Sequence, residues 1–301
     1  MKPLQASSGD VIADRRADYA EMLFAVGEHA AAAELLLSAL ELAPSWALGW
    51  FRLGEMQEAL GALDEAARSW MTALRLEPAD RPGAALKLAL IGHASQAVAA
   101  PSAFVEALFD QYAGSFDSSL VGKLGYRVPH HVMEAIRARG ERRFSLALDL
   151  GCGTGLMGEM LRPVTERLEG YDLSAGMLRK ALEKGVYDHL AKADISAFSY
   201  SGPKADLVTA ADVFIYMGAL QPVVSTVAGL LADGGLLAFS LEKLAGDDDF
   251  RLQPSRRYAH SENYVRRLLE QNGLTLLSLD ERALRQDRGE PVAGMIVVAG
   301  R

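Results

Sequence analysis

Residues 146–158 read LALDLGCGTGLMG, and this stretch decides the fold of the second part of the chain. It begins as a continuous apolar run, which is typical of a buried parallel strand. The run ends in Asp149, and Gly151, Gly153 and Gly155 follow before a helical pattern resumes. Glycines directly after a strand let a ligand lie against bare backbone at the start of a helix. We therefore expect a small molecule to bind at this turn.

The spacing of these glycines separates the turn from two common phosphate-binding loops. Dinucleotide-binding folds carry Gly-x-Gly-x-x-Gly, and phosphate loops end in Gly-Lys-Ser/Thr. Here the pattern is Asp-x-Gly-x-Gly-x-Gly. It resembles the first motif of class I S-adenosylmethionine-dependent methyltransferases. The resemblance implies that S-adenosyl-L-methionine is the cofactor, and it favours this family over an oxidoreductase that uses a nicotinamide nucleotide.

Composition narrows the class of protein further. The chain has 301 residues, half of them hydrophobic, which is enough for about two domains with cores of their own. Its 39 acidic and 31 basic residues give a net charge of -8, which argues against a general nucleic-acid-binding protein. No segment reaches the roughly 20 uncharged residues of a membrane span, and the first residues lack the apolar core of a signal peptide. We expect a cytoplasmic protein without membrane contact.

The N-terminal part of the sequence repeats itself at an offset of 34 residues. The matched pairs are Gly27 and Gly61, Ala32 and Ala66, Leu36 and Trp70, Ala39 and Ala73, and Pro44 and Pro78. This period is that of tetratricopeptide repeats, and Trp50, Leu53 and Gly54 match the Trp, Leu and Gly of the repeat's first helix. The resemblance implies two repeats of paired helices, with residues 84–98 as a capping helix.

The role of the repeats stays open between two interpretations. They can form a groove that docks a peptide or protein, or a module for dimerisation or packing. At least three repeats are usually needed for independent stability, so we expect this module to be stabilised by its neighbour. Pro101 interrupts the helical periodicity, and we predict a helical module over residues 1–100 and a methyltransferase domain over residues 101–301.

After the first motif the chain alternates strands and helices, which indicates an open parallel sheet covered on both faces. A strand is expected to end in Asp172, followed by a helix that Ser174 caps. The last two apolar runs, 274–284 and 292–299, resemble the closing antiparallel hairpin of the family's sheet. The predicted fold is thus an α/β, seven-stranded Rossmann-like sheet of order 3-2-1-4-5-7-6. Its ligand would lie across the carboxyl ends of the strands.

Two acidic residues stand where the family contacts its cofactor. Asp172 ends the second strand, where a carboxylate can accept hydrogen bonds from ribose hydroxyls. Asp194 stands where the family's third motif places an acid beside the adenine amino group. The resemblance implies further cofactor contacts from residues in the first motif or next to the strand ends: Asp149, Gly151, Cys152, Gly153, Leu173, Met177, Ile195 and Ala211. Cys152 is expected to be a small side chain of the loop rather than a nucleophile.

The segment ahead of the first motif is rich in aromatic residues. Residues 109–117 resemble the FD-x-YA-x-x-FD stretch of a bacterial group with fused tetratricopeptide repeats, and in class I enzymes this segment often forms a lid over the cofactor. The resemblance implies ligand contacts from Tyr112, Tyr126 and Arg127. The alternative is that the aromatic residues belong to the core.

Methyl transfer depends on holding the acceptor in line with the sulfur–methyl bond, and an oxygen or nitrogen acceptor can need a base. The preferred candidates for catalysis are His260, Tyr216 and Tyr112; the others are His130, His131 and Glu242. Arg257 lies close to His260 in the sequence, and an arginine there would suit an acceptor that bears a carboxylate. A solvated loop ahead of a helix capped by Ser261 is the alternative interpretation of this stretch.

A sequence pattern of other methylases is missing here, and its absence narrows the class of methyl acceptor. ADVFIYMG stands at 211–218, where DNA and protein amide methylases carry Asn-Pro-Pro-Tyr, so adenine and amide acceptors are disfavoured. The acidic run 247–249 is expected to be solvated, and we expect no metal. The favoured function is methyl transfer to a small molecule or a docked protein. The alternative is a non-catalytic, partner-binding protein with a degenerate methyltransferase domain.

Overall fold

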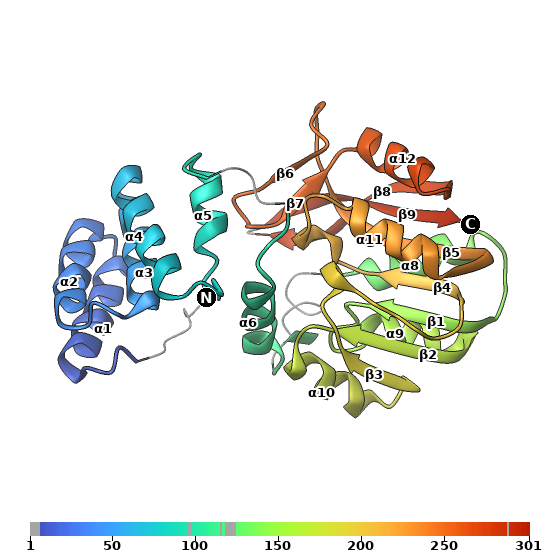
Figure 1. Cartoon of the computed structure of the whole chain (residues 1–301), viewed down its shortest axis with the longest axis horizontal. Coiled ribbons are helices and arrows are strands. Elements are labelled where there is room, and N and C mark those ends of the chain that lie inside the picture. The colour runs from blue at the N-terminus through green and yellow to red at the C-terminus, as the bar shows by residue number, and fades with distance from the viewer. Residues whose placement is uncertain (1–6, 95–97, 115, 118–124, 288) are drawn as a thin grey trace. The chain divides into compact units, whose positions relative to one another are not determined.

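The computed structural model describes residues 7–94, 98–114, 116–117, 125–287 and 289–301. The chain divides into two compact units, Met1–Phe104 and Val105–Arg301 (Figure 1). The first unit is helical, and the second is built on a mixed sheet. The expected boundary at Pro101 stays a prediction.

The first unit consists of paired helices. Its elements are α1 (Val11–Ala25), α2 (His29–Leu42), α3 (Ala47–Ala59), α4 (Leu63–Leu76) and α5 (Ala84–Leu90). α1 packs on α2 and α3 on α4, with further contacts between α2 and α3 and between α4 and α5. Gly27 and Gly61, which are 34 positions apart, have φ angles of +90° and +76° in the turns that join each pair. Only glycine adopts such angles at little cost, so the two turns are built alike.

Small residues let the helices of each pair approach closely. Ala32 and Ala66 are fully buried. A Cβ added to Gly54 on α3 would lie 2.3 Å from Nε1 of Trp70 on α4. The expected capping helix is shorter than predicted: it ends at Leu90, because Gly92 adopts a φ of +77° and its N–H bonds back to the Ala89 carbonyl. Residues 95–97 of that prediction lie outside the described residues.

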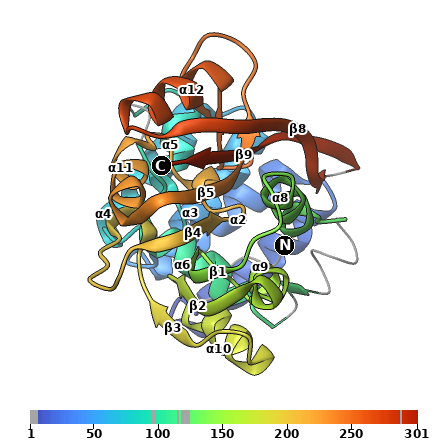
Figure 2. The ribbon, with the colours of Figure 1, turned by 90° about the vertical axis from the view of Figure 1, so that its right-hand side faces the viewer.

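The second unit holds a sheet of nine strands among the described residues. These strands are β1 (Phe144–Leu150), β2 (Thr165–Asp172), β3 (His189–Lys192), β4 (Ala205–Ala210), β5 (Leu231–Lys243), β6 (Phe250–Leu252), β7 (Tyr258–His260), β8 (Thr275–Asp287) and β9 (Glu290–Gly300). The parallel strands pair as β3-β2-β1-β4-β5, then β9 pairs antiparallel with β5, and β8 with β9 (Figure 2). With β8 and β9 counted as the sixth and seventh main strands, the predicted order 3-2-1-4-5-7-6 is confirmed.

Helices cover both faces of this sheet. α8 (Val128–Arg137) and α9 (Leu156–Leu161) pack on one face, and α11 (Gln221–Leu230) and α12 (Glu262–Gln271) lie over the other (Figure 2). Successive residues of β1 alternate between two cores: Ala147 packs with α8 and α9, and Leu148 packs with α11 and α12. The central strands are therefore buried on both sides, and the carboxyl ends of β1, β2, β4 and β5 lie at one edge.

A short hairpin extends the sheet at that edge. β6 and β7 pair with each other, and β7 pairs in parallel with Glu242 and Lys243 at the end of β5. Glu242 also pairs with β9, so β7 occupies the other edge of β5, beyond the end of β4. The interpretation of residues 257–260 as a solvated loop is wrong, because Tyr258, Ala259 and His260 form a buried strand. The expected cap is confirmed: the Ser261 hydroxyl accepts from the Tyr264 N–H at the start of α12.

Among the described helices, none combines the length and the apolar content that a bilayer crossing requires.

Candidate functional site

Asp149 ends the predicted first strand and lies fully buried beneath the glycine loop. Its carboxylate accepts hydrogen bonds from the Tyr187 hydroxyl at 2.7 Å and from the Thr209 hydroxyl at 2.8 Å. Burial raises the pKa of this carboxyl to about 6, against the lowering effect of the two hydroxyls. Each carboxylate oxygen thus accepts one side-chain hydroxyl, and the bond to Thr209 joins the end of β1 to β4.

The glycine loop after β1 presents bare backbone at Gly153. Its φ is +54°, and a Cβ built there would meet no atom within 4 Å, so this side of the backbone faces open space. Gly151 has another function, because a Cβ there would lie 2.3 Å from Cγ2 of Val213 after β4. Cys152 between them is buried, and burial raises the pKa of its thiol well above the ordinary value. That environment is opposite to the one that activates a cysteine nucleophile.

Asp172 joins the glycine loop to the end of β2. One carboxylate oxygen accepts from the Gly153 N–H at 2.9 Å, and the other accepts from the Ser174 N–H at 2.8 Å. The side chain is buried, and burial raises its pKa while the backbone bonds lower it. The backbone of Leu173 also bonds to this carboxylate, whose two oxygens have about four acceptor sites in all, so acceptor capacity remains for a ligand hydroxyl. The predicted cap is confirmed: the Ser174 hydroxyl accepts from the Met177 N–H and opens α10 (Ala175–Lys184).

These features pass a simple test of fit for a nucleoside cofactor. An unfilled Gly153 Cβ position and a carboxylate with spare acceptor sites lie within one hydrogen bond of each other. The chemistry suits a ribose diol, because both hydroxyls are donors. Asp172 and Gly153 would hold that group when the cofactor is bound.

The remaining predicted cofactor residues lie around the same strand ends. Leu173 is half-buried after β2, and Met177 is fully buried in α10. Asp194 follows β3, and its carboxylate accepts from the N–H and hydroxyl of Ser196. Ile195 is buried beside it, and Ala211 is half-buried directly after β4.

The helix α6 (Ser102–Tyr112) carries an acidic residue that sequence reasoning missed. Asp110 accepts from the Ser174 hydroxyl at 2.5 Å and from the Gly176 N–H at 2.9 Å, at the start of α10. Asp117 accepts from the hydroxyl of Thr154 in the glycine loop and pairs with Lys184 at 3.0 Å. Asp110 therefore binds the start of α10, and Asp117 binds the glycine loop and the last turn of α10. The spacing of this motif was the signal in the sequence that could have identified Asp110 and Asp117.

A second group of charges lies at the carboxyl ends of β4 and β5. Asp212 follows β4 at a φ of +58°, and Glu242 lies near the end of β5. Arg285 on β8 binds both, with a nitrogen 3.0 Å from Oδ2 of Asp212 and another nitrogen on Glu242. Arg257 contacts Glu242 more loosely, at 3.9 Å, and its side chain is 29% exposed. Arg285 was not predicted because its partners are 43 and 73 residues away along the chain.

The predicted tyrosines lie around these charges. Tyr126 is buried, and its pKa is raised by burial and by the charges of Asp212 and Asp149. Tyr216 is buried in the turn after β4 and meets Phe109 of α6 edge-on at 5.5 Å. Tyr112 is half-buried, with a pKa raised by burial. Arg127 is exposed at the start of α8.

His260 lies inside an apolar shell on β7. Its ring is fully buried and contacts the rings of Phe250 and Tyr264, and Phe250 in turn contacts Tyr258. Nε2 lies 3.0 Å from the Gly218 carbonyl. Because a carbonyl only accepts, Nε2 carries the proton and Nδ1 keeps the lone pair. Burial lowers the pKa of this histidine to about 4. The arrangement makes His260 a weak base. His130, another candidate base, is exposed on α8.

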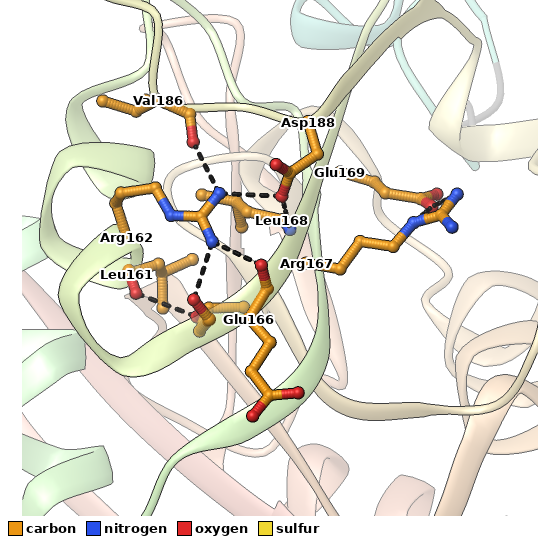
Figure 3. A network of polar contacts seen from close by, with 9 residues as sticks. Leu161, Arg162, Glu166, Arg167, Leu168, Glu169, Val186 and Asp188 are labelled. Carbon is orange, nitrogen blue, oxygen red and sulfur yellow. Dashed lines mark hydrogen bonds and ion pairs between the residues drawn. The ribbon is translucent and has the colours of Figure 1, made fainter.

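The opposite edge of the sheet carries a different kind of polar network. Arg162 pairs with Asp188 at 2.7 Å and donates to the carbonyls of Thr165 and Glu166 (Figure 3). Asp188 also accepts from the Leu168 N–H at 2.7 Å, directly before β3. These contacts join the beginnings of β2 and β3. Asp188 is therefore a suitable control for Asp172, because it also accepts a backbone N–H but lies at the opposite edge of the sheet.

Within the part of the chain that the structure describes, no three metal-ligating side chains lie together. In the acidic run 247–249, Asp248 pairs with Arg251 and Asp249 pairs with Arg267.

Comparisons with known proteins agree with this geometry. Residues 148–237, which include the glycine loop and Asp172, match a family described as a methyltransferase domain. A malonyl-[acyl-carrier protein] O-methyltransferase of Enterobacter lignolyticus is 32% identical over 158 residues, 52% of this chain and 60% of that protein. A trans-aconitate 2-methyltransferase of Paracidovorax citrulli is 34% identical over 116 residues, 38% of this chain and 42% of that protein.

A crystal structure of an S-adenosylmethionine-dependent methyltransferase from Clostridium acetobutylicum aligns with a TM-score of 0.49 and 20% identity, over 64% of this chain and 98% of that one. The chain spans 60% or less of the length of the two curated relatives named above. The matched region runs from β1 into β5, and it contains the glycine loop, Asp172, Asp194 and Asp212 of the candidate site.

Proposed function

We propose that this protein transfers a methyl group from S-adenosyl-L-methionine to a small-molecule acceptor. The observation that supports the proposal is the contact between Asp172 and Gly153, because it joins a buried carboxylate that could accept from ribose hydroxyls to open backbone within the matched region. Asp149, Leu173, Met177, Asp194, Ile195 and Ala211 would complete the cofactor site around it. The relatives named for malonyl-[acyl-carrier protein] and trans-aconitate support a small acceptor group.

The sulfonium of the bound cofactor supplies an electrophilic methyl carbon and a neutral leaving group. The residues of this chain then have to position the acceptor and exclude water. Three tyrosines support this role: Tyr216 is buried in the turn after β4, Tyr126 is buried ahead of α8, and Tyr112 is half-buried at the end of α6. We assign them to orientation of the acceptor, and Arg257 to its binding. Arg127 is proposed as an outer contact.

We infer that the first unit is a tetratricopeptide-repeat module. The equivalent turn glycines at a spacing of 34 residues, the buried Ala32 and Ala66 and the close contact at Gly54 support this inference. The module would dock a partner or a second copy of the chain.

Turnover tests the proposed activity. The full chain is incubated with methyl-labelled S-adenosyl-L-methionine and the small-molecule fraction of a cell extract, and the transferred label is counted. We expect transfer by the native protein, a loss of at least tenfold in Asp172→Asn at limiting cofactor, and native rates in Asp188→Asn. Equal label with native protein and with no protein, despite bound cofactor, would support the non-catalytic alternative.

A further inference from the structure

We propose that the outer face of α1 is a dimer interface, on which α1 of a second copy of this chain packs across a two-fold axis. This inference concerns the first unit, rests on the docking role proposed for it, and names one occupant. It follows from the direction in which the side chains of α1 point and from how the equivalent positions of α3 are covered within the same unit.

The large apolar residues of α1 point away from the core of the first unit. The buried residues of this helix are Ala13, Ala17 and Ala20, which pack with α2. On the opposite side, within an arc of about 100° at 3.6 residues per turn, lie residues that are 56–75% exposed: Val11, Ile12, Tyr19, Met22 and, at the C-cap, Val26. A surface helix normally turns its apolar stripe toward the core. α1 does the reverse, and such a contiguous exposed face is typical of an interaction site.

The repeat in the first unit shows what kind of element covers this face. On α3, 34 positions further along the chain, the residues equivalent to Tyr19 and Met22 are Leu53 and Met56. Both are at most 1% exposed and belong to the same apolar cluster as the buried residues of α2. α2, α3 and α4 each pack on two neighbouring helices, whereas α1 packs chiefly on α2 (Figure 1). The face that α3 buries against a helix is thus the face that α1 leaves exposed, so a helix fits there too.

A helix packed as closely as α2 packs on α3 does not fit this face, because Arg15 stands where α3 has Gly49. A Cβ added to Gly49 would lie 2.8 Å from Cδ2 of Leu40 on α2, so the two helices approach closely at this glycine. Arg15 prevents the same approach on α1. Its guanidinium also needs an acidic partner once the face is covered, because an unpaired charge is costly to bury.

A second copy of α1 supplies both an apolar surface and an acid. Among the described helices, α4 comes next in exposed large apolar residues, but these are spread over more than half of its circumference: Leu63, Met71 and Leu76. In an antiparallel α1 pair centred between residues 18 and 19, Arg15 lies about four residues, or about 6 Å along the helix, from Asp18 of the partner subunit. An arginine side chain can span that distance. Contact between identical faces closes a two-fold dimer instead of building an open chain.

The size of the face determines how stable this dimer is. α1 has 15 residues, so it is about 22 Å long and about 10 Å wide. A pair of such helices buries less than the roughly 800 Å² per partner of a standard interface. We therefore expect a reversible dimer whose population rises with protein concentration.

Sedimentation equilibrium of the full chain measures this dimer. Between about 1 and 200 µM, the mean mass should rise from that of one chain toward that of two. Tyr19→Glu and Met22→Glu should each raise the dimer Kd about tenfold or more, because a carboxylate in an apolar interface is costly to bury. Both residues are exposed, so each variant should keep the native Tm. Met71→Glu is the matched control, because Met71 is exposed on α4 of the same unit, and it should keep the native Kd.

Cross-linking tests which helices meet. The chain has a single cysteine, Cys152, and it is buried. Asp18→Cys places a thiol close to the expected two-fold axis, and a short bismaleimide should join two chains of this variant. Glu34→Cys is the control, because Glu34 is an exposed acid on α2, and it should give little cross-linked dimer at the same concentration.

The contrary results have distinct meanings. A native chain that stays monomeric at the highest concentration overturns the proposal and leaves the face to a helix of another protein. Native dimerisation in both glutamate variants, an equal loss in Met71→Glu, or equal cross-linking of Glu34→Cys overturns the assignment to α1. Calorimetry on the same variants should give the native affinity for S-adenosyl-L-methionine. Failure of the native chain to bind that compound contradicts methyl transfer and does not bear on the dimer.

Discussion

Replacing Asp172 with asparagine removes one carboxylate oxygen from the point where the glycine loop meets the end of β2. In the native protein the two oxygens accept from the N–H groups of Gly153 and Ser174, at 2.9 and 2.8 Å. An asparagine amide offers one oxygen, so one of these N–H groups faces an NH2 donor whichever way the amide turns. An unsatisfied buried donor costs about 1–3 kcal/mol, which leaves most of a typical folding free energy of about 5–15 kcal/mol.

The effect on the cofactor follows from the charge. A hydrogen bond to a charged group contributes about 1.5–3 kcal/mol and a neutral one about 0.5–1.5 kcal/mol, so the loss for the ribose contact is about 1.4 kcal/mol, or tenfold in Kd. Calorimetric titration of S-adenosyl-L-methionine into the folded variant measures it. Asp188→Asn is the control, since Asp188 also accepts a backbone N–H but lies at the opposite edge of the sheet. Native affinity in Asp172→Asn, or an equal loss in Asp188→Asn, would refute the reasoning.

Asp149, Asp110 and Gly54 offer further tests. Burial raises the pKa of Asp149 from 3.8 to about 6 in the folded state, so the stability that the protonated group contributes is lost as the pH rises through 6. Asp149→Asn should therefore reduce the fall in Tm between pH 4 and 7. An unchanged fall in Tm would contradict this pH dependence. Asp110→Ala removes the contacts of α6 with Ser174 and Gly176, so we expect a several-fold faster release of S-adenosyl-L-methionine in stopped-flow measurements. Glu106→Ala is the control, because it only loses an exposed ion pair with Lys192, and it should release the cofactor at the native rate. Gly54→Ala would place a Cβ 2.3 Å from Trp70 and should lower the stability of the first unit by about 1–3 kcal/mol in denaturant titrations, whereas Gly229→Ala, whose Cβ meets no atom within 4 Å, should cost little.

Local patterns in the sequence were enough to predict the strand ends and the helix cap around the candidate site. Asp149 and the glycines mark a strand end through a change from apolar residues to glycine, and the short distance from Asp172 to Ser174 fixes both a strand end and a helix cap. The order of the main strands came from resemblance to a family, because spacing alone does not determine which strands pair.

The parts of the site that sequence reasoning missed depend on contacts between distant residues. The β6–β7 hairpin has strands of only three residues, which are too short for a clear alternation of apolar and polar residues, and the non-glycine Arg256 adopts a φ of +62° after the turn residues Pro254 and Ser255. Arg285 lies on a solvent-facing hairpin pattern, and only the packing of β8 brings it to Asp212 and Glu242. Burial of His260 likewise depends on the pairing of β7 with the end of β5.

The proposed activity requires that the turn after β1 and the carboxylate at the end of β2 bind a sulfonium nucleoside. Parallel calorimetric titrations of the full chain with S-adenosyl-L-methionine and with NADH test it most directly. We expect one S-adenosyl-L-methionine to bind per chain, with an affinity about tenfold lower in Asp172→Asn, and no heat of binding from NADH. Binding of NADH alone, or of neither compound, would contradict it.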